Sequence, residues 1–226
     1  MGSNYRSANV PQRAAAADTD IKIASVHNTY VKFTNLANNG YICKDMIKVV
    51  ETSIPGVVII EPTVFGDSRG YFFESWSQRD FDAAVAPTVF VQDNESKSRY
   101  GVLRGLHFQK GEYAQSKLLR VVKGRVLDVA VDIRKGSPTF GKHVSVELSE
   151  DNHRQLFIPR GFAHGFVVLS EEAICQYKCD SFYHRESEAG IAWNDPALGI
   201  DWKIPQEDII LSEKDSRNPL LKDISL

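Results

Sequence analysis

From Met46 onward, apolar and polar residues alternate with a period of two in short runs, which Gly, Pro, Asp or Asn separate. This pattern is typical of β-strands that bury one face. It predicts strands over residues 57–61, 118–122, 125–133, 143–148, 155–158, 166–169 and 174–179. Helix is predicted only in short pieces, over residues 78–85 and 205–210. So many short strands in one domain predict an all-β fold, a jelly roll or barrel whose closed edges leave a central cavity.

The strand pattern also predicts one local connection. A hairpin across Lys123-Gly124 is expected to join the strands over 118–122 and 125–133. In the second of these strands, alternation separates two faces. One face would hold Leu127, Val129, Val131 and Ile133, and the other Val126, Asp128, Ala130 and Asp132.

Residues 1–45 differ in composition from the rest of the chain. Residues 7–20 are small, polar and rich in alanine, which predicts a flexible leader, and strand character follows around residues 29–33. The beginning of the chain has no apolar core of the kind that a secretory signal needs. We therefore expect an N-terminal extension over residues 1–45, without an assigned role, and one domain over residues 46–226.

Charge and cysteine content exclude several classes of partner. The net charge is −2 and the basic residues are scattered, which gives no support to a nucleic-acid or anionic-membrane surface. No stretch approaches 18 consecutive apolar residues, so no transmembrane helix is predicted. Of Cys43, Cys175 and Cys179, the last two would lie about 13 Å apart along a strand, beyond disulfide reach. The cysteines therefore favour reduced thiols and a cytoplasmic protein.

The segment over residues 102–122 carries the densest set of chemically useful side chains. Arg104, His107, Gln109 and Lys117 lie there among apolar neighbours. Alternation places His107 and Gln109 on one face of a strand. Taken singly, such a histidine is more often a structural, hydrogen-bonded residue, and such a lysine is more often solvated. Their concentration in one segment favours a functional site.

Three later residues add to this set. Pro159, Gly161 and Gly165 are expected to frame His164 in a tight turn between two strands. Tyr177 would share a strand face with the small residues Cys175 and Cys179, although an aromatic in a strand is more often a core residue. Asp215, in the segment SEKD, could orient an imidazole as the third group of a triad does.

These segments belong to a longer series of motifs. The series is DSRGYFFES (67–75), QDN (92–94), VLRGLHFQ (102–109), QSKLLRV (115–121), DVAVDIRKGSPTFGKHVSVELS (128–149), IPRGFAHGF (158–166), WNDP (193–196) and SEKD (212–215). From about Met46 onward the chain resembles the dTDP-4-dehydrorhamnose 3,5-epimerases, the RmlC-type members of the cupin superfamily. LRGLHFQ followed by FAHGF is the most specific part of the resemblance, and residues 1–45 lie outside it.

The resemblance implies a jelly-roll (cupin) β-barrel, a homodimer, and no metal or organic cofactor. It implies an isomerase that epimerises C3 and C5 of dTDP-4-dehydro-6-deoxy-D-glucose, giving dTDP-4-dehydro-L-rhamnose for dTDP-L-rhamnose and polysaccharide biosynthesis. The implied catalytic residues are His107 as the base, Asp215 as its partner, Tyr177 as the opposing acid and Lys117 for the enolate. The implied substrate-binding residues are Arg69, Glu74, Gln92, Asn94, Arg104, Lys117, His164, Tyr183 and Glu188. Of these, Arg69 and Glu74 would reach across the dimer.

Three alternatives stay open at this point. Many cupins hold a metal through an HxH pair, a glutamate and a later histidine, and here Glu112 and His164 remain. The second position of the pair is Gln109, however, and a neutral amide is a poor replacement for imidazole in a transition-metal site. A related enzyme could epimerise only one carbon or act as a ketoisomerase. A cupin module that binds without turnover would be a different class of protein, and loss of His107, Asp215 or Tyr177 would have favoured it.

Overall fold

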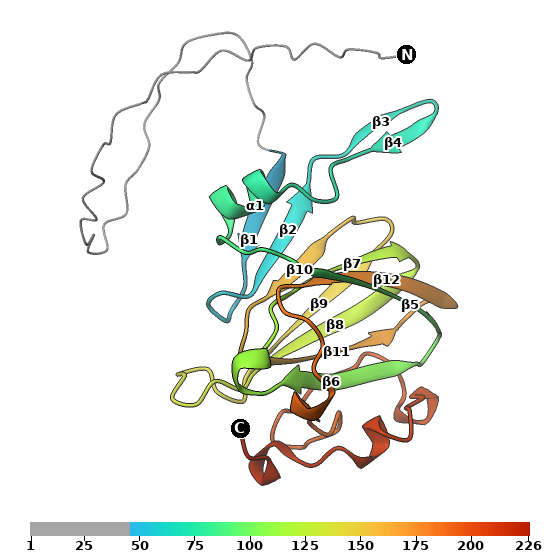
Figure 1. Ribbon diagram of the computed structural model, residues 1–226. Coiled ribbons are helices and arrows are strands. Elements are labelled where there is room, and N and C mark those ends of the chain that lie inside the picture. The colour runs from blue at the N-terminus through green and yellow to red at the C-terminus, as the bar shows by residue number, and fades with distance from the viewer. Residues whose placement is uncertain (1–45) are drawn as a thin grey trace, which may run out of the picture. The chain divides into compact units, whose positions relative to one another are not determined.

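Two antiparallel β-sheets face each other in the computed structural model, which describes residues 46–226 (Figure 1). The six-stranded sheet has the order β1 (Ile47–Glu51), β2 (Val58–Pro62), β10 (Gln155–Ile158), β7 (Lys117–Lys123), β12 (Glu172–Cys179) and β5 (Gln92–Arg99). The five-stranded sheet has the order β13 (Glu188–Gly190), β6 (Leu103–Gln109), β11 (Phe162–Val168), β8 (Arg125–Asp132) and β9 (His143–Ser149). The predicted all-β jelly roll is confirmed, whereas the extension over residues 1–45 lies outside the described residues.

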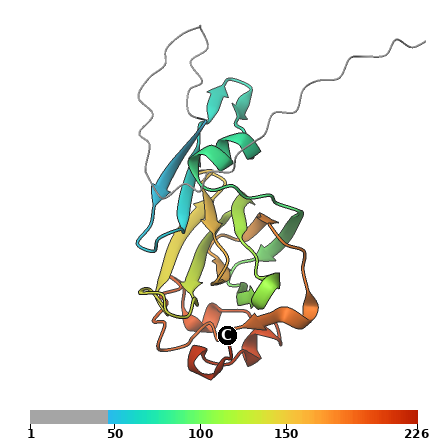
Figure 2. The ribbon, with the colours of Figure 1, turned by 60° about the vertical axis from the view of Figure 1, so that its left-hand side comes forward.

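The remaining elements are short. A separate two-stranded hairpin consists of β3 (Phe65–Asp67) and β4 (Gly70–Phe72), and it projects away from the two sheets (Figures 1 and 2). The helices are α1 (Gln78–Ala84), η1 (Gly111–Tyr113), η2 (Arg185–Ser187), η3 (Gln206–Asp208), η4 (Asp215–Arg217) and η5 (Leu221–Asp223). The predicted helices over 78–85 and 205–210 thus correspond to α1 and η3. Among the described residues, no helix is long and apolar enough to cross a membrane.

Three apolar clusters hold the layers together. The first lies between the sheets and combines residues such as Leu119 and Leu156 with Val126 and Phe166 from the facing sheet. The second covers the outer face of the five-stranded sheet with the C-terminal segment, including Trp202. The third covers the outer face of the six-stranded sheet. Because both faces of the five-stranded sheet are covered at its centre, β11 is buried along its whole length and β8 along all but its first residue.

In β8 the predicted alternation of faces is confirmed. Val126 and Ala130 belong to the cluster between the sheets, whereas Leu127, Val129 and Val131 belong to the outer cluster. Asp128, which shares the inner face, is completely buried. A completely buried carboxylate needs partners, because an unpaired buried charge costs several kcal/mol.

The predicted hairpin between β7 and β8 is wrong. β7 pairs with β10 and β12 in the six-stranded sheet, while β8 pairs with β11 and β9 in the other sheet. The chain turns a corner at Gly124, which has φ +76° and where a Cβ atom would lie 2.0 Å from the carbonyl oxygen of Glu172. Alternation reveals which face a side chain occupies, but it does not reveal which strand is the partner.

The predicted tight turn around His164 is also wrong. β11 begins at Phe162, so His164 lies inside a strand, and the turn comes earlier, after β10. In β11, His164 pairs with His107 of β6 on one side and with Ala130 of β8 on the other. The two histidines are therefore directly opposite each other on neighbouring strands, and their side chains share one face of the sheet.

Candidate active site

A β-bulge in β6 brings Arg104 and His107 to the same cavity. His164 pairs with His107 and Phe166 pairs with Arg104, so β6 has one more residue in this interval than β11. The extra residue turns both side chains inward, which simple alternation would not allow. The bulge requires glycine, because Gly105 has φ +136° and a Cβ atom there would lie 2.5 Å from the Cα atom of Gly165.

His107 is hydrogen-bonded to Asp215. Their Nε2 and Oδ1 atoms are 2.5 Å apart, and the side chains are 28% and 5% exposed. Burial raises the pKa of Asp215, but hydrogen bonds from His107, Ser212 and the Gly105 N–H lower it more, so the pKa lies below its ordinary value. The histidine is thus accessible and its carboxylate partner is buried and ionised, which is the arrangement of an oriented general base.

Backbone hydrogen bonds bring Asp215 to β6. The N–H of Leu103 donates to the carbonyl oxygen of Ile210 at 2.9 Å, and the N–H of Ile210 donates to that of Gly101 at 2.8 Å. The N–H of Asp215 then donates to the Ser212 hydroxyl at 3.0 Å, at the start of η4. Residues 210–215 of the C-terminal segment therefore lie along the beginning of β6, which places the Asp215 carboxylate beside the His107 imidazole.

Lys117 and Tyr177 face this pair from the six-stranded sheet. They lie on the adjacent strands β7 and β12, where Lys117 pairs with Cys179. Burial lowers the pKa of Lys117, and the nearby Cys179, Asp128 and Glu188 oppose this shift. Burial raises the pKa of Tyr177, so its hydroxyl stays protonated at neutral pH.

A cavity of about 400 Å³ brings these groups together. Its walls include Ser96, Arg104, His107, Lys117, His164, Phe166, Tyr177, Ile210, Ser212, Lys214 and Asp215. A second cavity of about 290 Å³ shares His107, Lys117 and Tyr177 with the first. Two neighbouring cavities therefore meet at the three residues best suited to move protons and stabilise negative charge.

The second cavity contains a polar network. Its lining includes Gln92, Asn94, Gln115, Tyr183 and Glu188. Gln92 Nε2 donates to Asn94 Oδ1 at 2.9 Å, and the N–H of Tyr183 donates to Gln92 Oε1 at 3.0 Å. The Tyr183 hydroxyl donates to Glu188 Oε2 at 2.8 Å. With Lys117, five of the predicted substrate-binding residues thus line this cavity.

His164 has a carboxylate partner that the sequence analysis did not assign to the site. Its Nε2 lies 2.9 and 3.1 Å from the two carboxylate oxygens of Asp128, and both side chains are buried. Burial lowers the pKa of His164, and Asp128 opposes the shift. Asp128 lies between Val126 and Ala130 on the inner face of β8, and a carboxylate between these apolar residues was the available signal in the sequence.

Several further lining residues were missed. Ser96 and Lys214 border the first cavity and Gln115 borders the second. Lys214 forms an ion pair with Glu188, which connects the C-terminal segment to the second cavity. None of them stands out locally, because a single Ser, Lys or Gln in a polar stretch is an ordinary surface residue.

Arg69 and Glu74 are not brought to either cavity. Arg69 lies at the turn of the β3–β4 hairpin, where its guanidinium pairs with Asp67. Glu74 follows β4 and has a buried Oε2 atom without a hydrogen-bond partner among the described residues. All six residues of β3 and β4 are exposed, among them Phe65, Tyr71 and Phe72.

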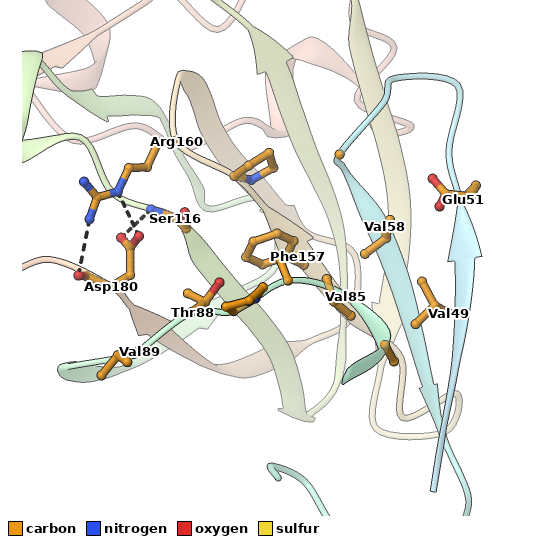
Figure 3. A pocket seen from close by; sticks show the side chains of 15 residues that line it. Val49, Glu51, Val58, Val85, Thr88, Val89, Ser116, Phe157, Arg160 and Asp180 are labelled. Atoms are coloured by element: carbon orange, nitrogen blue, oxygen red, sulfur yellow. Dashed lines mark hydrogen bonds and ion pairs between the residues drawn. The ribbon is translucent and has the colours of Figure 1, made fainter. Parts of the chain in front are cut away.

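A larger groove of about 710 Å³ lies elsewhere, between β1, β2, β10 and the segment after α1 (Figure 3). Its cation Arg160 is occupied by an ion pair with Asp180, which also accepts the N–H of Ser116 (Figure 3). No histidine lines it. The groove lacks an available acid–base pair, so the candidate active site is the pair of neighbouring cavities.

For residues 46–226, the structure shows the state of the cysteines and whether side chains gather as metal ligands. Cys175 and Cys179 are free and buried, and burial raises their pKa to about 12 and about 11, which keeps both thiols unreactive. In this part of the chain, no group of three or more His, Cys, Asp and Glu side chains is arranged to hold a metal ion. The expectation of a metal-free enzyme stays a prediction.

Known proteins are similar to this chain in sequence. The family profile described as dTDP-4-dehydrorhamnose 3,5-epimerase matches residues 51–223. The dTDP-4-dehydrorhamnose 3,5-epimerase of Salmonella typhimurium is 58% identical over 177 residues, which cover 78% of this chain and 96% of the relative.

Solved structures agree with the sequence comparison. The crystal structure of dTDP-4-dehydrorhamnose 3,5-epimerase from Elizabethkingia anophelis has 56% identity and a TM-score of 0.76, covering 79% of this chain and 98% of that one. The RmlC enzyme of Legionella pneumophila, solved with dTDP-4-keto-L-rhamnose, has 49% identity and a TM-score of 0.77, with coverage of 79% and 95%. The chain therefore belongs to the dTDP-4-dehydrorhamnose 3,5-epimerase family of isomerases, which confirms the resemblance of its motifs.

Proposed function

We propose that this enzyme epimerises C3 and C5 of dTDP-4-dehydro-6-deoxy-D-glucose to give dTDP-4-dehydro-L-rhamnose. The observation that carries the proposal is the convergence of the His107–Asp215 pair, Lys117 and Tyr177 on the boundary between two cavities. Epimerisation beside a ketone needs a base that removes a proton, a charge that stabilises the enolate, and an acid on the opposite side.

His107 is the proposed base. A neutral imidazole near working pH can take the proton from C3 or C5, because both carbons flank the C4 ketone. Asp215 holds the ring through Nε2, so Nδ1 is the nitrogen that accepts the proton. The ionised carboxylate then stabilises the imidazolium that forms.

Tyr177 and Lys117 complete the proposed reaction. Tyr177 lies on β12, in the sheet that faces the sheet of His107, so the acid and the base approach the sugar ring from opposite walls. An acid placed there returns a proton to the face opposite the one that lost it, which inverts the carbon. The Lys117 ammonium stabilises the developing charge on the C4 oxygen.

The second cavity is the proposed nucleotide subsite. Tyr183, which is half exposed, offers an aromatic face to thymine, and Gln92 and Asn94 offer amide groups to its edges. Arg104 of the first cavity and Arg69 are the proposed partners of the pyrophosphate, because a guanidinium binds phosphate oxygens in a fixed fork. His164 is proposed to bind the sugar.

We further propose that the enzyme is a homodimer in the cytoplasm, and that Arg69 and Glu74 act in the site of the second subunit. The exposed β3–β4 hairpin supports this, because an isolated two-stranded hairpin needs a surface to pack on. The exposed Phe65, Tyr71 and Phe72 offer an apolar contact area. The free cysteines suit a reducing compartment.

Proton NMR of the 4-keto sugar nucleotide with enzyme in deuterated water tests the proposed reaction. We expect deuterium to enter both C3 and C5 and the L-configured product to form. Deuterium at C5 but never at C3, or the reverse, would identify an epimerase that acts on one carbon. Binding of the substrate without any exchange would identify a binding module and reject the proposed chemistry.

A further inference from the structure

Gln109 ends β6 two residues beyond His107, and only 7% of it is exposed. Its amide contacts three main-chain groups. Nε2 donates to the carbonyl oxygens of Tyr113, at 2.8 Å, and Phe182, at 3.4 Å. Oε1 accepts from the N–H of His184 at 2.6 Å. One side chain therefore connects the strand of the proposed base to two separate loops.

The two loops also contact each other. The rings of Tyr113 and His184 are stacked, with centroids 3.8 Å apart and an interplanar angle of 9°. Gln115 Nε2 donates to the carbonyl oxygen of Ser181 at 2.7 Å. Because the loops are joined to each other, the amide of Gln109 fixes them as a pair relative to β6.

These loops form a wall of the second cavity. Tyr183 lies between the two residues that Gln109 contacts in the second loop, and its N–H and hydroxyl are bonded to Gln92 and Glu188. All of these side chains line the cavity. A shift of the loop would therefore move the aromatic ring and the polar groups that the nucleotide is proposed to meet.

The chemistry of the three contacts explains why an amide is needed. Two carbonyl oxygens require donors and one N–H requires an acceptor, and a carboxamide offers both from a single planar group. An ionised glutamate has no donor, and a neutral histidine has one N–H only. The position that holds the second histidine of a metal-binding cupin is thus occupied by a side chain whose polar atoms are all committed to the backbone.

We propose that Gln109 is a positioning residue, which holds the loops at residues 113 and 182–184 so that the nucleotide subsite is formed before substrate arrives. This rests on the proposed function, because the second cavity is taken as the nucleotide subsite. A preformed wall strengthens binding by removing the cost of ordering the loops in the complex. The residue should accordingly affect binding more than the chemical step.

The test is the variant Gln109→Glu, which keeps size and shape but replaces two donors with an acceptor. We expect KM for the sugar nucleotide and the calorimetric Kd for dTDP to rise about tenfold, with kcat changing by less than about threefold. Gln78→Glu is the matched control, because Gln78 Nε2 donates to the carbonyl oxygen of Thr88 at 2.8 Å, outside both cavities. Its KM and Kd should equal those of the wild type.

Gln109→Met serves as a second variant that brings no buried charge. If either variant folds and kcat falls while KM and Kd stay constant, Gln109 does not position the subsite. If neither variant folds, its role is to stabilise the fold, and the proposal is likewise rejected. A wild-type enzyme that neither binds dTDP nor turns over would instead overturn the proposed function, whatever the variants do.

Discussion

The Nε2 atom of His107 lies 2.5 Å from Oδ1 of Asp215, although 108 positions of sequence separate the two residues. The imidazole belongs to β6, the second strand of the five-stranded sheet, and the carboxylate belongs to η4 in the C-terminal segment. The pair therefore depends on the docking of that segment along β6. It also fixes the orientation of the imidazole through Nε2.

Replacing Asp215 with Asn is expected to reduce kcat about 10²-fold, because the amide neither fixes the same tautomer nor stabilises the imidazolium. Steady-state kinetics checks this. Glu213→Gln is the control, since Glu213 lies two residues away on the surface and pairs with Arg217. Equal kcat values for the wild type and Asp215→Asn would contradict the proposed role.

The stability difference between the wild type and Asp215→Asn is also expected to depend on pH. The pKa of Asp215 is lower in the folded protein than its ordinary value, so its ionised form stabilises the fold above about pH 4, the pKa in the unfolded chain. This contribution is lost as pH falls through the folded pKa. Urea unfolding should therefore separate the wild type from Asp215→Asn at pH 7, and the difference should shrink in acid.

Tyr177→Phe is expected to leave proton removal intact while abolishing inversion. His107 would still remove the proton beside the ketone, and after that proton has exchanged with solvent the base would mostly return a deuteron to the same face. In deuterated water, NMR should show label in recovered substrate, with product formation reduced about 10²-fold or more. Normal product formation would mean that another group supplies the proton.

Lys117→Met is expected to lower kcat by about 10² to 10³, because the enolate loses the cation proposed to stabilise it. Lys123→Met, on the same strand but exposed and paired with Glu172, should retain activity. Burial lowers the pKa of Lys117, so wild-type activity should decline on the alkaline side below the ordinary lysine pKa of about 10.4. A pH profile of kcat shows whether that decline disappears in the Lys117 variant.

Gly105→Ala is expected to unfold the site or the whole domain, because the added Cβ atom would lie 2.5 Å from the Cα atom of Gly165 in addition to the strain of a positive φ. Gly136→Ala separates the two effects. Its φ is +81° but no atom lies within 4 Å of the added Cβ, so it should cost only about 1 kcal/mol of strain. Thermal unfolding and activity of both variants provide the comparison.

Mixing two inactive variants tests the proposed dimer. If Arg69 acts in the partner's site, subunits carrying Arg69→Ala and His107→Ala should form heterodimers in which one site is intact. Activity should then return to about a quarter of the wild type after random exchange of subunits, by the symmetry of a two-fold interface. An unchanged background would show that Arg69 serves its own subunit or none.

The sequence allowed the fold class to be predicted, and most of the residues that it singled out for a site line the two cavities. Alternation at residues 125–133 was sufficient to assign faces, because both faces of β8 contact apolar clusters. The motifs around His107 and Asp215 indicated a pair that the structure brings into contact. The pairing of strands was harder to predict from the sequence. The connection between β7 and β8 resembles a hairpin locally, yet the chain passes at Gly124 from one sheet to the other.

Two further features lay beyond sequence reasoning. The bulge that turns Arg104 and His107 to one side arises from the packing of Gly105 against Gly165, which are 60 positions apart and belong to different motifs. Asp128 was placed on the correct face, but its bond to His164 depends on the pairing of β8 with β11. Contacts between distant strands depend on the assembled sheet, and no local pattern encodes them.

The docking of residues 210–215 along β6 has a consequence for refolding experiments. The two sheets bury their shared cluster without help from the C-terminal segment, whereas the outer cluster and the His107–Asp215 bond both require that segment. A contact between residues so far apart in sequence is costly to form early. Regain of activity should therefore lag behind regain of strand content. An activity assay during refolding would report when the C-terminal segment docks.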